Sequence, residues 1–227
     1  MIRAGQVRLN GKLQRDPEAA VSEKHDRIEV NGKAVETRDK IYLMLNKPRG
    51  VVTTASDEKG RETVYTTLRG SSLPWVAPVG RLDKASEGLL LLTNDSEWGA
   101  RIAAPETHLD KTYHVQVGTL VSEQDVQALA LGVKGKNGEV LQVKYVRRLR
   151  VGQKNCWLEI VLDEGKNRQI RRMMESMEVE VLRLVRVAVG TVQLGDLAKG
   201  AHRSLTKAEK EMLDGEMLGS GPRGKTS

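Results

Sequence analysis

The chain has 227 residues, and 39% of them are apolar, which is enough material for a substantial core and excludes a largely disordered protein. Lys and Arg outnumber Asp and Glu by 37 to 30, so the net charge is +7 and favours an anionic partner such as nucleic acid. Aromatic residues make up 3% and Phe is absent, which argues against a multi-base stacking platform. With no apolar run of membrane-spanning length and no signal peptide, we expect a cytoplasmic protein without membrane contact.

The first 39 residues are polar and contain two similar phrases, VRLNGKL at 7–13 and IEVNGKAV at 28–35. Each phrase is a short alternating strand that runs into Asn-Gly, the strongest short hairpin signal. We therefore predict a small β-rich appendage over residues 1–39. Its plainest interpretation is a surface hairpin that covers the main domain.

The main domain is predicted at 40–215, and it opens with IYLMLNKPRG at 41–50, a buried strand. Residues 56–75 are expected to form a long loop with a short helix. The run GLLLLTND at 88–95 is continuously apolar over strand length, which is typical of a strand covered on both faces. Residues 216–227 have the composition of a flexible tail.

The other elements are predicted from capping residues and hydrophobic periodicity. Helices are expected at 97–104, capped by Asp95 or Ser96, at 122–131, where SEQD at 122–125 resembles a capping box, and at 167–177, with a closing helix capped by Thr206. Strands are expected at 111–117, 140–149, 156–162 and 179–187. Nothing resembles regular βαβ alternation, so the predicted class is α+β with a mixed, mostly antiparallel sheet flanked by helices.

The segment 167–177 has the clearest helical pattern. Its apolar stripe consists of Ile170, Met173, Met174 and Met177. Its opposite side carries Arg168, Arg171 and Arg172. Two interpretations of these arginines stay open: a solvated helix face, or guanidinium groups that clamp phosphates or a carboxylate.

Asp83 stands between Arg81 and the apolar run at 88–95. An Asp followed by small polar residues is ordinarily a turn former. The buried strand that comes directly afterwards is a rigid support for a site residue, which favours a functional role. Tyr113 likewise has two interpretations, an aromatic residue at the core edge or a catalytic group.

Other catalytic schemes lack the necessary residues. The four histidines show no metal-ligand spacing, and the lone Cys156 can form neither an internal disulfide nor a cysteine-based zinc site. No nucleophile elbow, zinc-protease helix motif or phosphate-binding glycine loop is present. We therefore expect neither a metal nor a nucleotide cofactor.

Five blocks of the sequence, in order, resemble signature blocks of the RsuA-type bacterial ribosomal RNA pseudouridine synthases. The blocks are NKPRGVVTT, GRLDKASEGLLLLTND, KTYHVQV, EGKNRQIRRM and LVRVAVGTVQLGDLAKGAHRSL. The resemblance covers about 40–213, and the loop SDEKGRETVYTTL is similar to the RluB branch. It implies the pseudouridine synthase fold and the isomerisation of a specific rRNA uridine to pseudouridine, in 23S rather than 16S rRNA. No cofactor or metal is implied, and we expect a monomer.

The resemblance also implies three catalytic residues. Asp83 is the essential acid, which acts either as a nucleophile at the sugar carbon or as the base that removes a ribose proton. Tyr113 packs against the target base and helps to move the C5 proton. Arg171 pairs with Asp83, since an adjacent guanidinium stabilises a carboxylate in a closed pocket.

Five further residues are expected to bind the substrate. Leu184 lines the pocket, and Arg81 holds the target nucleotide out of its stack. The remaining three are Lys47, Arg168 and Arg172. Extrusion of a stacked base costs roughly a few kcal/mol, which phosphate contacts from arginines can offset.

The sequence departs from the family pattern at two positions. The family usually has Asp or Asn where this chain has Ala85, and Thr where it has Ser86. The family's N-terminal S4-like RNA-binding module normally begins with two helices, whereas only its strands have counterparts in residues 1–39. We therefore expect an incomplete S4-like module. The rival hypothesis is a non-catalytic RNA-binding or ribosome-assembly factor on the same fold, and a structural protein with a solvated basic face is a third.

Overall fold

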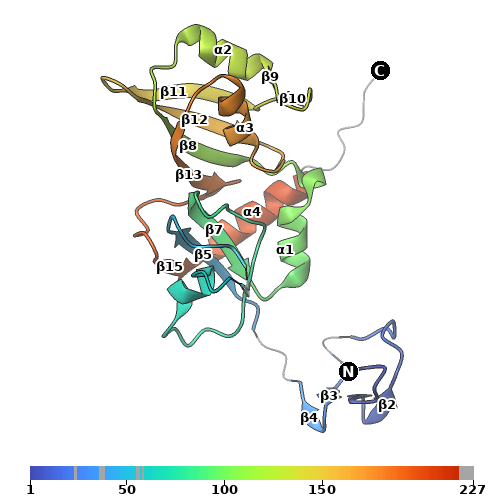
Figure 1. The fold of residues 1–227 in the computed structure, drawn as a ribbon. Helices are drawn as coiled ribbons and strands as arrows, with labels where there is room; N and C mark the ends of the chain where they lie inside the picture. Colours follow the sequence, from blue (N-terminus) through green and yellow to red (C-terminus); the bar gives the residue numbers. More distant parts are fainter. Residues whose placement is uncertain (23–24, 36–38, 55–56, 58, 220–227) are drawn as a thin grey trace, which may run out of the picture. The chain divides into compact units, whose positions relative to one another are not determined.

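The computed structural model describes residues 1–22, 25–35, 39–54, 57 and 59–219, in two compact units, Met1–Lys40 and Ile41–Ser227 (Figure 1). The first unit is an antiparallel sheet in the order β2-β1-β3-β4. Its strands are β1 (Val7–Leu9), β2 (Lys12–Gln14), β3 (Ile28–Val30) and β4 (Lys33–Ala34). Asn10 and Asn31, the first residues of the two Asn-Gly turns, have φ of 50° and 52°, which matches the hairpin turns that the sequence predicts. The β-rich appendage is confirmed.

The second unit is built on one large mixed sheet, whose main path runs β11-β12-β8-β13-β7-β5-β15. Its strands are β5 (Tyr42–Lys47), β6 (Ala77–Pro78), β7 (Glu87–Thr93), β8 (Lys111–Val117), β11 (Tyr145–Val151), β12 (Cys156–Leu162), β13 (Val181–Val189), β14 (Val192–Gln193) and β15 (His202–Ser204). Every pair of these strands is antiparallel except β13 with β7. The predicted α+β class with a mostly antiparallel sheet is therefore confirmed.

The helices begin largely where the sequence predicts. They are α1 (Ser96–Ala103), α2 (Glu123–Leu131), α3 (Gln169–Ser176) and α4 (Lys207–Gly219), with short 3-10 turns η1 (Val64–Leu68) and η2 (Pro105–Thr107). Asp95 caps α1 through its side chain, and Ser122 and Asp125 form the predicted capping box of α2. Helix α4 continues into the segment expected as a tail, whose last residues, 220–227, lie outside the described residues. None of the described helices is both long and apolar enough to cross a bilayer.

The single strand predicted at 140–149 is two strands in the structure. Strand β10 (Val140–Leu141) pairs with β9 (Val133–Lys134) in a separate two-stranded sheet, while β11 belongs to the main sheet. Alternation of apolar residues indicates that a segment is a strand, but it does not indicate with which strand that segment pairs. It therefore could not show that the chain passes from one sheet to another between β10 and β11.

The main sheet has two faces, and three core clusters show how each face is covered. On one face, which we call the α3 face, α2 and α3 cover β11, β12, β8 and β13, the outer half of the sheet. The inner half consists of β7, β5 and β15, and residues within 51–82 cover the same face of β7 and β5. On the other face, which we call the α4 face, α1 and α4 cover the inner half (Figure 1). Strand β7 is buried along its whole length, as its leucine run predicts.

The two halves of the sheet meet where β7 and β13 run parallel. The register pairs Glu87 with Val185 and Gly88 with Arg186. Gly88 has a φ of +103°, and a Cβ built on it would lie 2.2 Å from the backbone oxygen of Arg186. Only glycine fits this backbone conformation and this close approach. The motif glycine thus joins the halves of the sheet directly beside the Asp83 loop.

Candidate active site

Asp83 lies in the loop between β6 and β7, and its side chain is half-buried. The Thr53 hydroxyl donates to the backbone oxygen of Leu82 at 2.8 Å and accepts from its N–H at 3.3 Å. The backbone N–H of Gly50 donates to the oxygen of Lys84 at 2.8 Å. Hydrogen bonds from the segment after β5 therefore fix the loop on both sides of Asp83.

Lys47 holds the same loop from inside the protein. Its side chain is fully buried, and its ammonium group donates to the backbone oxygens of Pro48, Asp83 and Ser86 at 3.1, 3.2 and 2.8 Å. An ammonium group has three hydrogens, so these contacts use all of them. We predicted that Lys47 binds the substrate, and the structure contradicts this, because no part of the side chain is accessible. Lys47 is a positioning residue for the Asp83 loop.

Burial lowers the pKa of Lys47 to about 8, against the opposing charges of Asp83 and Glu87. A lysine in the unfolded chain keeps its proton to about pH 10.4, so the unfolded state binds more protons between these values. We therefore expect the free energy of unfolding to rise with pH between 8 and 10, by at most about 3 kcal/mol. Urea denaturation of the wild type and of Lys47→Met at several pH values measures the effect.

The Lys47→Met chain is expected to lack this rise, while effects common to both chains cancel in the difference. Tyr42, whose pKa is raised to about 12 by burial and by its hydrogen bond to Asp95, opposes the trend only above pH 10. Parallel curves of unfolding free energy against pH for the two chains between pH 8 and 10 would show that Lys47 does not cause the rise.

The three arginines at the start of α3 contact different groups. Arg168 forms the ion pair with Asp83, with 3.4 Å between Nη1 and Oδ2. Arg171 donates instead to the backbone oxygen of Ala85 at 3.0 Å, within the same loop. Arg172 pairs with Glu139 at 2.6 Å. The predicted contact between Arg171 and Asp83 is therefore wrong in its partner, although both Arg168 and Arg171 are brought to the Asp83 loop.

The reason for this difference lies in the backbone of Arg168. It has a φ of 48° and precedes the first helical residue, so its side chain does not lie on the helix face where the sequence placed it with Arg171 and Arg172. Burial lowers the pKa of Arg171, with a further lowering by Arg168 and an opposing effect of Asp83. Positive charge is thus concentrated around the Asp83 loop at the start of α3.

Tyr113 and Leu184 lie on the α3 face, on neighbouring strands of the outer half. Leu184 is buried in the cluster beneath α3. Tyr113 is half-buried and packs against that cluster and also against the one that contains Leu82, the residue before Asp83. Its ring therefore stands where the two clusters of the α3 face meet, beside the Asp83 loop.

Arg81 is exposed and forms no hydrogen bond or ion pair with any residue that the structure describes. A long cationic side chain without a protein partner, two residues from Asp83, is available to a bound anion. This placement is compatible with the substrate contact that the resemblance implies for it.

Further basic residues that we did not single out from the sequence extend this positive region. Arg49 donates to the backbone oxygen of Leu182 at 3.2 Å, and the buried Arg186 donates to that of Leu89 at 2.7 Å. Burial, and then the charge of Arg186, lowers the pKa of Lys111. These residues lie inside the five sequence blocks that resemble the family, and this position was the signal that could have identified them. Only the fold shows that these segments lie close together.

Comparison with known proteins places this fold and site in a family. The family model described as RNA pseudouridylate synthase matches residues 41–176. "Ribosomal large subunit pseudouridine synthase B" of Bacillus subtilis (strain 168) is 35% identical over 94% of this chain and 87% of its own length. An "Uncharacterized RNA pseudouridine synthase" of Aquifex aeolicus (strain VF5) is 34% identical over 94% of this chain and 85% of its own length.

Solved structures agree with the sequence relatives. A "Crystal structure of pseudouridylate synthase" has 30% identity and a TM-score of 0.69, and covers 93% of this chain and 90% of that chain. The archaeal box H/ACA sRNP Nop10-Cbf5 complex, at 15% identity and a TM-score of 0.50, shares the fold alone. The predicted fold class and the resemblance to the RsuA-type synthases are confirmed, and the chain belongs to the RNA pseudouridylate synthase family.

Proposed function

We propose that this RNA pseudouridine synthase isomerises one specific uridine of large-subunit ribosomal RNA, with Asp83 as the group that acts on the ribose. The observation that carries the proposal is the anchored Asp83 loop: the carboxylate pairs with Arg168, while Lys47 and Arg171 bind the surrounding backbone oxygens. The 35% identity to a protein named for the ribosomal large subunit supports the choice of RNA.

The reaction changes the connectivity of the nucleotide without adding or removing atoms. The bond between N1 of uracil and C1′ of the ribose breaks, the base turns, and C5 forms the new bond to C1′. The proton on C5 leaves, and N1 gains one. Asp83 serves this reaction either as a nucleophile at C1′ or as the base that removes a ribose proton. Both roles require a rigidly placed carboxylate that faces the sugar, which the anchored loop supplies.

Neighbouring side chains take the supporting roles. Tyr113 stacks on the extruded base and helps to move the C5 proton, and Leu184 closes the pocket beneath it. Arg81 contacts the backbone of the target nucleotide and stabilises its extruded form, at a cost of roughly a few kcal/mol in lost stacking. Arg168 holds the Asp83 carboxylate and so acts at the site itself, as the 3.4 Å contact supports.

The direct test uses ribosomal RNA from a strain that lacks this gene. Incubation with the purified chain, followed by chemical mapping of pseudouridine, is expected to show one new modified position in 23S rRNA and none in 16S rRNA. A modified position in 16S rRNA alone would contradict the choice of subunit. No new position in either RNA would favour a non-catalytic RNA-binding or ribosome-assembly factor instead.

A pair of α3 variants tests the assignment of the arginines. Arg171→Ala is expected to lower the rate of pseudouridine formation by about 10²-fold or more, because the hydrogen bond that fixes the backbone oxygen of Ala85 beside Asp83 is lost. Arg172→Ala makes the same charge change on the same helix but removes the ion pair with Glu139. Its expected contact with the substrate affects affinity, so at saturating RNA less than about a threefold effect on the rate is expected. Initial rates on 23S rRNA provide the comparison. Equal losses in the two variants would contradict the separate role of Arg171.

A further inference from the structure

The outer half of the sheet has a second face, opposite the Asp83 site. Along β8 and β12, Val115 and Leu158 are buried in the cluster beneath α3, so their neighbours point to the α4 face. His114, Trp157 and Glu159 are such neighbours, and all three are only half-buried. Among the described residues, no core cluster covers this part of the α4 face.

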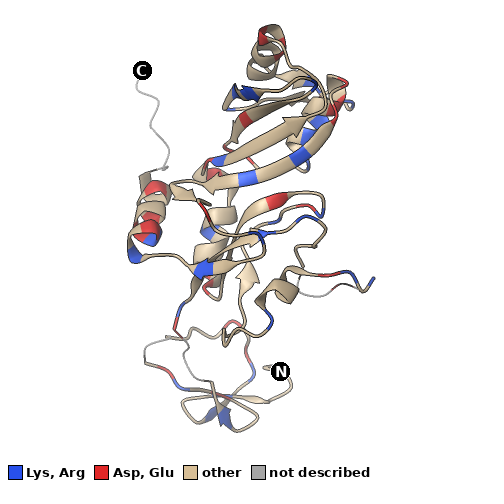
Figure 2. Cartoon of the chain, turned by 90° about the vertical axis from the view of Figure 1, so that its left-hand side faces the viewer, with Lys and Arg blue, Asp and Glu red and all other residues tan. Residues whose placement is uncertain are grey.

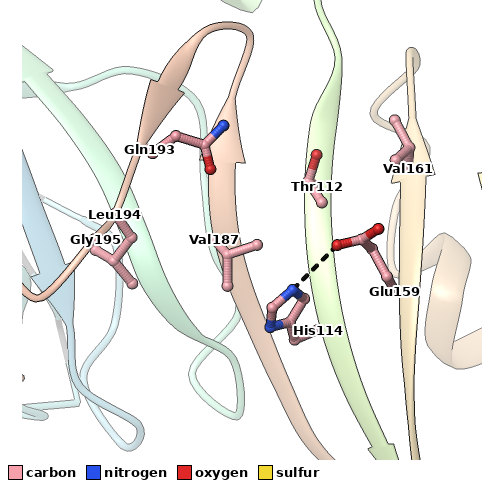
Figure 3. Close-up of a pocket in the computed structure, with 8 residues that line it drawn as sticks. All are labelled: Thr112, His114, Glu159, Val161, Val187, Gln193, Leu194 and Gly195. Carbon is pink, nitrogen blue, oxygen red and sulfur yellow. Dashed lines mark hydrogen bonds and ion pairs between the residues drawn. The ribbon is translucent and has the colours of Figure 1, made fainter. Parts of the chain in front are cut away.

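Two adjoining hollows form a groove across this uncovered area, which we call the open groove. The larger, of about 630 Å³, is lined by Thr112, His114, Glu159, Val161, Val187, Gln193, Leu194 and Gly195 (Figure 3). The smaller, of about 370 Å³, is lined by His114, Leu149, Arg150, Trp157 and Val185. His114 borders both hollows. Each volume falls in the range of roughly 300–1,000 Å³ that is usual for sites binding small molecules, which suits a nucleotide.

Arginines flank the groove on the side of Trp157. The guanidinium of Arg150, on β11, lies 4.8 Å from the centre of the indole, and that of Arg183, on β13, lies 5.5 Å from it. These strands stand on opposite sides of β12, so cations reach the indole from both directions. Stacking on an aromatic ring restricts an arginine while leaving its N–H donors available to an anion.

The charges of the arginines beside Trp157 favour an anionic ligand. Arg183 is paired with Glu87 at 2.9 Å, whereas Arg150 forms no ion pair with any described carboxylate. Arg147 also lies on this face and pairs with Glu159 at 2.7 Å. Lys and Arg positions follow the strands of the outer half in Figure 2. A half-buried indole between cations, with hollows beside it, is suited to a strand that carries both phosphates and bases.

We propose that the open groove binds a single-stranded segment of the substrate RNA, with phosphates on Arg150 and Arg183 and bases in the two hollows. The proposal rests on the proposed function, because the RNA is the substrate whose target uridine enters the Asp83 site. It adds a second contact surface on the opposite face of the sheet. A substrate that wraps from one face to the other gains affinity and register without any change in the reacting groups.

Two variants of the same strand test the proposal. Arg150→Ala removes a guanidinium on the groove, whereas Arg148→Ala makes the same charge change on the opposite face, where Arg148 pairs with Glu123 of α2 at 3.1 Å. The affinity of the full chain for transcribed, protein-free 23S rRNA is measured over a range of salt concentrations. Arg150→Ala is expected to weaken binding about fivefold or more and to reduce the salt slope by about one, while Arg148→Ala stays within about twofold.

Equal effects of Arg150→Ala and Arg148→Ala, or no effect of Arg150→Ala, would overturn the proposal. A loss of activity on ribosomal subunits with unchanged affinity for protein-free rRNA would also overturn it, since the partner would then be a protein. Thermal unfolding of both variants checks that the sheet is intact.

Indole fluorescence gives a second, direct readout. Trp98 is buried and Trp75 is exposed, so in a Trp75→Phe chain the accessible indole is Trp157. Saturating 23S rRNA is expected to reduce acrylamide quenching of that indole at least about twofold. Unchanged quenching at saturation would contradict the proposal. Pseudouridine is mapped in the same samples. Reduced quenching without pseudouridine would contradict only the proposed function. Pseudouridine with unchanged quenching would contradict only the proposed binding of RNA to the open groove.

Discussion

Asp83→Asn is expected to lower the rate of pseudouridine formation on 23S rRNA by at least about 10⁴-fold, which is the scale on which removal of a covalent or proton-transferring group acts. The amide keeps the size of the carboxylate but cannot act as a nucleophile or accept the ribose proton at neutral pH. RNA affinity should change little, because the loop stays anchored through Lys47 and Thr53. Single-turnover rates and equilibrium binding separate the two effects.

The matched control is Lys84→Ala, which changes the exposed neighbour of Asp83 in the same loop. Its backbone oxygen, which accepts from the N–H of Gly50, is kept in the variant. Less than about a threefold change in rate is expected, as for other exposed charges. Full activity of Asp83→Asn would remove the basis for the whole account of the site.

Gly88→Ala is expected to destabilise the second unit by more than about 4 kcal/mol, because single substitutions have effects of this size when they cause severe backbone conflicts. The added Cβ would lie 2.2 Å from the oxygen and 2.8 Å from the nitrogen of Arg186, both backbone atoms of a buried strand. The φ of +103° adds strain for any residue with a side chain. Because β7 and β13 are the strands that join the two halves of the sheet, neither can move aside without loss of the Asp83 loop's support.

Gly215→Ala in α4 is the control for this glycine. No atom lies within 4 Å of the built Cβ, and the backbone is helical, so alanine is expected to stabilise the helix by roughly 0.5–1 kcal/mol. Urea denaturation of the two variants provides the comparison. If Gly88→Ala unfolded at the wild-type midpoint, the close approach of β7 to β13 would be wrong.

Much of the fold followed from local signals in the sequence. The leucine run predicted a strand buried on both faces, and β7 is buried along its length. The capping residues Asp95 and Ser122 marked the starts of α1 and α2, because a side-chain acceptor at that position satisfies free backbone donors. Both Asn-Gly phrases formed their hairpins. Each of these features depends on neighbouring residues only, and for that reason composition and spacing were sufficient.

The site could be predicted in its residues but not in all of its contacts. Lys47 was expected to bind the substrate, and only the fold shows that three backbone oxygens surround it. Arg168, and not Arg171, pairs with Asp83, and Arg168 lies before the first residue of α3 instead of inside the predicted helix. The open groove had no sequence signal, since Arg150, Trp157 and Arg183 come from three strands whose order the sequence does not state.

The most direct test of the central claim follows the C5 proton. In 23S rRNA carrying tritium at C5 of its uridines, formation of the new bond from C5 to C1′ must release tritium to water. The wild-type chain is expected to release tritium in an amount equal to the pseudouridine formed, and Asp83→Asn is expected to release none above background. Release by Asp83→Asn at the wild-type rate, or no release by the wild type, would contradict the central claim.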